Sequence, residues 1–222
     1  MELVDQISNS GVFDEMAPPL KVALFLGSLA FLTTALVTVT AFTRIVIVLS
    51  FVRRALSTQE IPPTPVILGL SMFLTLFVMG PTFDQISSQG VVPYLNKTKT
   101  GSQAIAAGTQ ALSEFMLRQV RKPDLALFIH MAKIPSPESA ADTPLRVLIP
   151  AFVISELKTA FIMGFCLYIP FLLIDLVVST VLMSMGMMMM PPVVISTPLK
   201  ILLFVLVDGW QLVTHALTSS FN

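Results

Sequence analysis

Methionines crowd one short stretch of the chain, and their thioethers could either bind a soft metal or form an adaptable apolar surface. In residues 183–190, six of eight side chains are methionine, and Pro191 and Pro192 follow. Thioethers are soft metal ligands, and they are also flexible groups that fill variable shapes. Adjacent side chains diverge in an extended loop, so consecutive methionines are a poor copper chelate within one chain. The stretch favours an adaptable apolar surface, with simple apolar filling as the alternative.

Several charged residues interrupt the apolar runs, and their chemistry there would be ion pairing or contact with water. They are Glu156, Lys158, Asp175, Lys200 and Asp208, with Arg44 in an earlier apolar run. A charge at the bilayer centre costs roughly 2.5–3.5 kcal/mol on insertion scales, so five would cost on the order of 10 kcal/mol. We therefore predict that these charges are buried in pairs, in water or in a protein assembly, and do not face lipid.

Motifs typical of enzymes and metal sites are absent from the sequence. It contains no HExxH, GxSxG, P-loop or paired-cysteine motif. We interpret His130 and His215 as packing or surface residues. Cys166 lies inside an apolar run, where we expect a buried small apolar residue that cannot form an internal disulfide. A membrane-embedded enzyme would need a nucleophile and a base, and no candidate pair is evident. We predict no catalytic residue, no metal site and no cofactor, and the zero net charge argues against nucleic-acid binding.

The composition is that of a membrane protein with several apolar helices. Hydrophobic residues make up 55% of the 222 residues, charged residues 12%, and the mean hydropathy is +0.85. Residues 22–43 and 66–79 are predicted as the first two spans, and Arg53 and Arg54 favour a cytoplasmic connector between them. The first apolar run starts after an acidic tail and is longer than a signal-peptide core, so we expect no signal peptide.

The remaining chain divides into a polar segment and an apolar one. We expect segments at 1–83, 84–146 and 147–222, with polar helices over 103–121 and 125–133. An apolar run over 147–174 should stop at Asp175, and a final helix should start at Thr197-Pro198. Gly186, Pro191 and Pro192 predict an irregular loop between long helices. We expect an all-α fold with kinked apolar helices in hairpins beside a smaller polar helical domain.

Three long strings of residues resemble the FliP family of the flagellar type III export gate. Residues 44–59 contain RIVIVLSF and ALSTQ, residues 155–178 contain SELKTAF and IPFLLIDLVV, and residues 186–210 contain GMMMMPP and FVLVDGW. Together with residues 73–81 they cover most of residues 44–210. Many family members carry a longer, signal-like N-terminus, whereas this one is short and acidic.

The resemblance implies a subunit of a protein-export channel in the bacterial inner membrane at the flagellar basal body. Such subunits form a pentamer-like helical ring with FliQ and FliR, raised above the bilayer toward the periplasm. FlhA, FlhB, membrane lipid and exported unfolded flagellar proteins are the other implied partners.

The resemblance also implies roles for individual residues. Met187, Met188, Met189 and Met190 would form a pore gasket. Phe115 and Phe128 would be lumen aromatics, although the residues alone equally allow ordinary core packing. Glu156 and Lys200 would form a charge pair between subunits.

The sequence leaves two other interpretations open. A virulence-type (injectisome) homologue is similar, but its last stretch usually matches less closely. A small-molecule or copper transporter would need facing ligands at helical spacing, and the chain has no internal repeat of the kind that inverted-repeat transporters show.

Overall fold

A computed structural model describes residues 17–58, 61–135, 143–187 and 189–221. The chain forms two compact units, each built from two separate stretches of sequence. The first unit combines Met1–Thr40 with Met79–Val153, and the second combines Ala41–Val78 with Ile154–Asn222. These units cut across the three consecutive segments expected from the sequence, because helices distant in sequence pack together within each of them.

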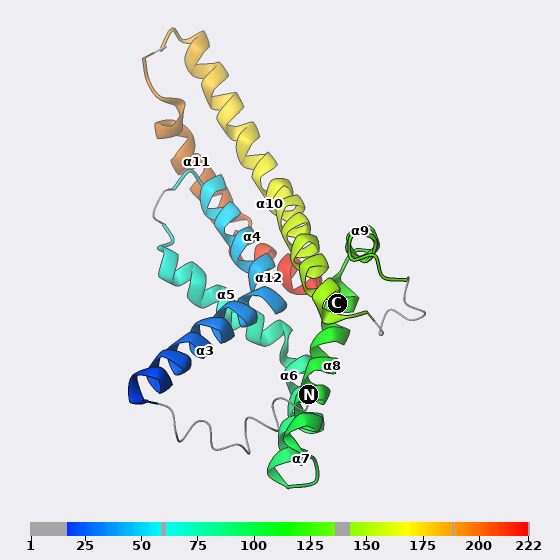
Figure 1. Ribbon diagram of the computed structural model, residues 1–222. Coiled ribbons are helices and arrows are strands. Elements are labelled where there is room, and N and C mark those ends of the chain that lie inside the picture. Colours follow the sequence, from blue (N-terminus) through cyan, green and yellow to red (C-terminus); the bar gives the residue numbers. More distant parts are fainter. Residues whose placement is uncertain (1–16, 59–60, 136–142, 188, 222) are drawn as a thin grey trace. The chain divides into compact units, whose positions relative to one another are not determined.

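All regular elements of the described residues are helical (Figure 1). The first unit contains α3 (Pro18–Val39), α6 (Gly80–Ile86), the π-helix η1 (Ser87–Val91), α7 (Val92–Leu95), α8 (Gly101–Gln119) and α9 (Lys122–Met131). The second unit contains α4 (Phe42–Ala55), α5 (Thr64–Val78), α11 (Pro192–Leu206) and α12 (Gly209–Ser219). The long helix α10 (Leu145–Ser184) contributes residues to both units.

Among the described residues, two helices are long and apolar enough to cross a membrane, namely α3 and α10. Two bent pairs would raise the number of spans to four if each pair forms one span. Within the second unit, the chain bends by 65° between Pro192–Leu206 and Gly209–Ser219. The prediction of an all-α, membrane-type fold with kinked apolar helices is confirmed.

The first unit is held by close helix contacts around α8. A capping box begins α8: the Thr100 hydroxyl accepts a hydrogen bond from the Gln103 amide, and the Gln103 side chain accepts one from the Thr100 amide. Gly90 in η1 lies so close to α8 that a Cβ there would stand 3.0 Å from the Ala104 carbonyl oxygen. Glycine at position 90 therefore allows the two backbones to approach.

In the second unit, α4 buries one apolar stripe formed by Ile45, Val48, Leu49 and Val52. These positions follow the i, i+3, i+4, i+7 pattern of an amphipathic helix. Gly164 of α10 faces α4, since a Cβ at Gly164 would lie 2.5 Å from the Phe51 ring. The Phe51 ring also meets Phe161 edge-to-face, with ring centroids 5.5 Å apart. The absence of a side chain at position 164 thus lets α10 pack against α4.

Several helix boundaries differ from those predicted. The first apolar run breaks at Thr40, which is extended, so that α3 and α4 are separate helices. Gly80-Pro81 ends α5 as expected, but the chain resumes at once as α6 with Pro81 in its first turn. Prolines are tolerated there because the first helical amides have no intrahelical acceptor.

Asp175, which ends the apolar run over residues 147–174, does not end a helix. Helix α10 continues unbroken to Ser184 and includes Asp175. The final helix also starts earlier than predicted, at Pro192 rather than at Thr197-Pro198, and Pro198 lies inside α11. The helix then breaks at Asp208, which adopts a left-handed conformation with φ 50°. The irregular methionine loop is confirmed, over the shorter range between Ser184 and Pro192.

Candidate functional site

Arg44 of α4 is the centre of a buried ion-pair cluster in the second unit. Its Nε donates a hydrogen bond to Glu156 Oε2 at 2.8 Å, and its Nη2 donates to Glu156 Oε1. Its Nη1 donates to the carbonyl and hydroxyl oxygens of Ser220, at 2.9 and 3.0 Å. The guanidinium also lies over the Phe221 ring, 3.8 Å from its centroid. Planar guanidinium groups suit such forked, stacked sites, so Arg44 joins α4, α10 and the end of the chain.

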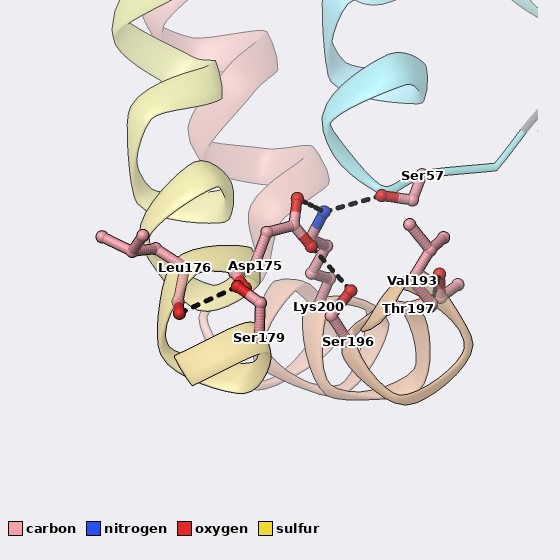
Figure 2. A network of polar contacts seen from close by, with 8 residues as sticks. All are labelled: Ser57, Asp175, Leu176, Ser179, Val193, Ser196, Thr197 and Lys200. Atoms are coloured by element: carbon pink, nitrogen blue, oxygen red, sulfur yellow. Dashed lines mark hydrogen bonds and ion pairs between the residues drawn. The ribbon is translucent and has the colours of Figure 1, made fainter. Parts of the chain in front are cut away.

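Lys200 of α11 lies in a second polar network, shown in Figure 2. Its ammonium group donates to Asp175 Oδ2 at 2.5 Å and to Ser57 Oγ at 2.6 Å. Ser196 donates to the other carboxylate oxygen of Asp175 at 2.6 Å. Ser57 follows the end of α4 with a positive φ of 57°, which turns its hydroxyl toward Lys200 (Figure 2). This network joins α10, α11 and the end of α4.

These contacts change the basis of the predicted charge pair between Glu156 and Lys200. The prediction assumed that neither charge has a partner in its own chain, and this assumption is wrong. Both side chains are fully buried, with 0% and 1% exposure, and each has an opposite charge within the chain. The pairing of Glu156 with Lys200 between subunits stays a prediction. For these two side chains to meet, the ion pairs Arg44–Glu156 and Lys200–Asp175 within the chain would have to open.

The remaining predicted buried charges divide into two groups. Arg44 is buried, and Asp175 is about one-third exposed but ion-paired with Lys200. Lys158 and Asp208 are exposed in the single chain, so their burial in an assembly stays a prediction. Lys158 is exposed because it lies on the face of α10 opposite Glu156, and Asp208 because it lies at the bend between α11 and α12.

The methionine loop connects α10 to α11 (yellow and orange in Figure 1). Gly186 opens the turn with φ 77°, a conformation that residues with a Cβ rarely adopt. Met187 and Met190 are exposed, and Met189 is 100% exposed. Met188 lies outside the described residues. Exposed thioethers at the tip of an apolar hairpin have no packing partner within the described chain, which disfavours the view that they only fill a core.

The two predicted lumen aromatics behave differently. Phe115 is only 4% exposed and meets Phe152 edge-to-face, with centroids 6.0 Å apart. Its burial in the first unit agrees with the core-packing alternative and not with a lumen position in this conformation. Phe128 of α9 is half-buried, so part of its ring is accessible. A lumen role for Phe128 stays a prediction.

Sequence reasoning missed the residues that complete both polar clusters. Ser57, Ser196, Ser220 and Phe221 carry no distinctive local pattern, and only the fold brings them to Arg44 and Lys200. One signal was available: Arg44 is a cation, and Glu156 an anion, within otherwise uncharged apolar runs. Such isolated opposite charges tend to pair when neither can face lipid.

The described residues hold no group of three histidine, cysteine or carboxylate side chains that could bind a metal ion. Cys166 is a free, exposed cysteine, which corrects the prediction that it is buried. The second unit contains two polar clusters that connect α4, α10 and α11, and one exposed thioether loop.

Comparisons with known proteins identify close relatives. A model of the FliP family matches residues 25–217. The chain is 50% identical over 220 residues to the flagellar biosynthetic protein FliP of Bacillus subtilis (strain 168), covering 99% of each. It is 52% identical over 198 residues to the protein of that name from Pectobacterium carotovorum subsp. carotovorum, covering 89% of this chain and 77% of the relative. With that of Buchnera aphidicola subsp. Acyrthosiphon pisum (strain APS), the identity is 51% over 204 residues, or 92% of this chain and 54% of the relative.

Proposed function

The chain belongs to the FliP family, and from this membership we propose that it is a channel-forming subunit of the flagellar type III protein export gate. It is a structural subunit of an export apparatus and not an enzyme. The names of its relatives support a flagellar role over a virulence one. In this proposal, unfolded flagellar proteins pass through a channel to which each copy contributes the turn between α10 and α11.

The observation that carries the proposal is the exposure of Met187, Met189 and Met190 on this turn. A seal against ions must be apolar, because a narrow apolar constriction empties of water. A seal that admits a polypeptide must also deform, and unbranched thioether side chains repack at low cost. A ring of such loops meets both requirements. Energy for transport has to come from other components, since the sequence has no P-loop.

A ring of several copies is supported by the apolar surface that one chain leaves exposed. Large side chains along α10 and α11 are more than two-fifths exposed, among them Phe165, Leu173, Leu202 and Leu206. Apolar patches of this kind mark contacts with protein or lipid. We propose that neighbouring copies in a pentamer-like helical ring, together with FliQ and FliR, cover part of this surface. The gate would lie in the inner membrane at the basal body, raised toward the periplasm, beside FlhA and FlhB.

Crosslinking to a stalled export substrate tests the proposal directly. The variant carries Met189→Cys in a Cys166→Ser background, because Cys166 is itself exposed and would react. A substrate that halts in the channel should form a crosslink at position 189. The matched control places the cysteine at Lys122, an exposed residue on α9 distant from the loop in sequence. No crosslink at position 189, in cells that still export and contain the stalled substrate, would overturn the channel role of the loop.

A further inference from the structure

Within residues 154–221 of the second unit, two charged side chains are left without a partner among the described residues. Arg44 neutralises Glu156, and Lys200 neutralises Asp175. The side chains of Lys158 and Asp208 make no hydrogen bond or ion pair with any described residue. One of these two is a cation and the other an anion. This part of the second unit therefore exposes one cation and one anion among apolar side chains, and Arg54 is a further exposed cation at the end of α4.

Lys158 lies on the outward face of α10. It follows Glu156 by two residues, which at about 100° per residue places the two side chains on nearly opposite faces of the helix. Glu156 faces α4 through Arg44, so Lys158 points away from the chain's own core. Ile154, Phe161 and Ile162, its neighbours at i−4, i+3 and i+4, are all exposed. The ammonium group is thus the single charge within an exposed apolar patch.

Asp208 occupies the bend between α11 and α12. Its backbone is left-handed, with φ 50° and ψ 50°, and its side chain does not cap α12. Asparagine and aspartate adopt this conformation more readily than other side chains, which explains a short polar residue there but not a charged one. Val205, Leu206 and Val207 before it are all exposed. The carboxylate is thus the single charge of a second exposed apolar patch.

We infer that Lys158 of one copy forms an ion pair with Asp208 of the adjacent copy, with the two apolar patches packed around it. The inference rests on the proposed ring. A contact between two different patches of the same chain is heterologous, and heterologous contacts build rings and helices. Anionic lipid could neutralise Lys158 but would repel Asp208. A second copy supplies the opposite charge and an apolar surround at both sites, which is why we assign it as the occupant.

Disulfide crosslinking between differently tagged chains tests the contact. Both chains carry Cys166→Ser; one carries Lys158→Cys and the other Asp208→Cys. Because each chain has one cysteine, a disulfide between the two tags forms only between copies. We expect the mixed-tag dimer on oxidation, and none when Asp208→Cys is replaced by Lys122→Cys. Absence of the dimer in a preparation whose native mass shows several copies would overturn the pair and leave the ring intact. Absence of any multi-copy species would overturn the proposed ring as well.

A neutralisation cycle gives an independent measurement. Lys158→Met and Asp208→Asn each leave one charge unpaired in the contact, and asparagine retains the left-handed backbone. Each single variant should lower the multi-copy fraction in native mass spectra, and the double variant should recover part of the loss. Lys122→Met, the matched control, should leave the fraction unchanged. If the decreases in the multi-copy fraction of the two single variants simply add in the double variant, the proposed ion pair is wrong. It is also wrong if Lys158→Met lowers this fraction while Asp208→Asn leaves it unchanged. The latter result would assign Lys158 to lipid.

Discussion

Arg44 and Glu156 lie 112 residues apart in the sequence and meet as a forked ion pair buried between α4 and α10. The other nitrogen of the guanidinium, Arg44 Nη1, donates hydrogen bonds to Ser220, and the Phe221 ring stacks on the planar face of the group. The pair thus joins the start of the second unit to the end of the chain. Two charged side chains that would be costly to expose to lipid thus form the contact that holds α4 and α10 together.

The first prediction is that removing one member of this pair lowers the free energy of unfolding more than removing both. Arg44→Met leaves the Glu156 carboxylate buried without its cation, at a cost of about 3–5 kcal/mol. The double variant Arg44→Met, Glu156→Leu buries no charge and should retain more stability. SDS titration in micelles, followed by fluorescence of Trp210, the chain's single tryptophan, measures the free energy of unfolding. If the double variant loses as much free energy of unfolding as Arg44→Met or more, the unpaired charge of Glu156 is not the main cost of removing Arg44.

The second prediction concerns an exchange of Glu156 and Lys200. With the intrachain partners described above, Lys at position 156 would face Arg44, and Glu at position 200 would face Asp175. Two like-charge contacts replace two ion pairs, so the exchange Glu156→Lys, Lys200→Glu should assemble less well than either single variant. The multi-copy fraction in native mass spectra is the measurement. Recovery of assembly by the exchange would instead demonstrate that Glu156 and Lys200 meet between subunits in the ring.

The matched control for this exchange reverses each pair within the chain. Arg44→Glu with Glu156→Arg, and separately Asp175→Lys with Lys200→Asp, keep opposite charges in contact. Each reversal should recover part of the assembly lost in its single variants. If neither reversal does so while the Glu156 and Lys200 exchange does, the intrachain pairs open on assembly.

Local chemistry accounts for the features that the sequence predicted well. The second predicted span, residues 66–79, lies close to the bounds of α5, which begins at Thr64-Pro65, since proline suits the first helical turn. Gly186 and Pro191 confine the methionine loop because neither favours a helix interior. Each of these features depends on a few adjacent residues.

Features that depend on distant residues could not be predicted. The Asp175 carboxylate is bound by Lys200 and Ser196, which lie 25 and 21 residues away, and no local pattern predicts these partners. Arg44 and Glu156 meet across 112 residues, with no periodicity to connect them. The break at Thr40 has no proline or glycine beside it, so the sequence shows one apolar run where the fold has two helices.

The third prediction separates Phe115 from Phe128. Phe115→Ala removes a buried ring from the first unit and should lower the free energy of unfolding by about 3–5 kcal/mol. Phe128→Ala removes a half-buried ring and should cost less. Thermal unfolding followed by circular dichroism makes the comparison. In the Cys166→Ser background, cysteine at position 128 should crosslink a stalled substrate and cysteine at position 115 should not. A crosslink at 115 alone would reverse the two assignments.

The last prediction concerns the bulk and the compliance of the methionine loop. Replacing Met187, Met188 and Met189 together by alanine removes side-chain volume from every copy, so the constriction should fill with water and conduct ions while export partly survives. Replacing the same three by leucine keeps the volume and the apolar character but loses adaptability, so the seal should hold while export falls. Conductance across a bilayer containing the assembled gate distinguishes the two variants. Native mass of each variant is the control, because a leak has meaning only in a complete ring. An alanine variant that is fully assembled and as tight as the original chain would refute the gasket role and leave these methionines as exposed apolar filler.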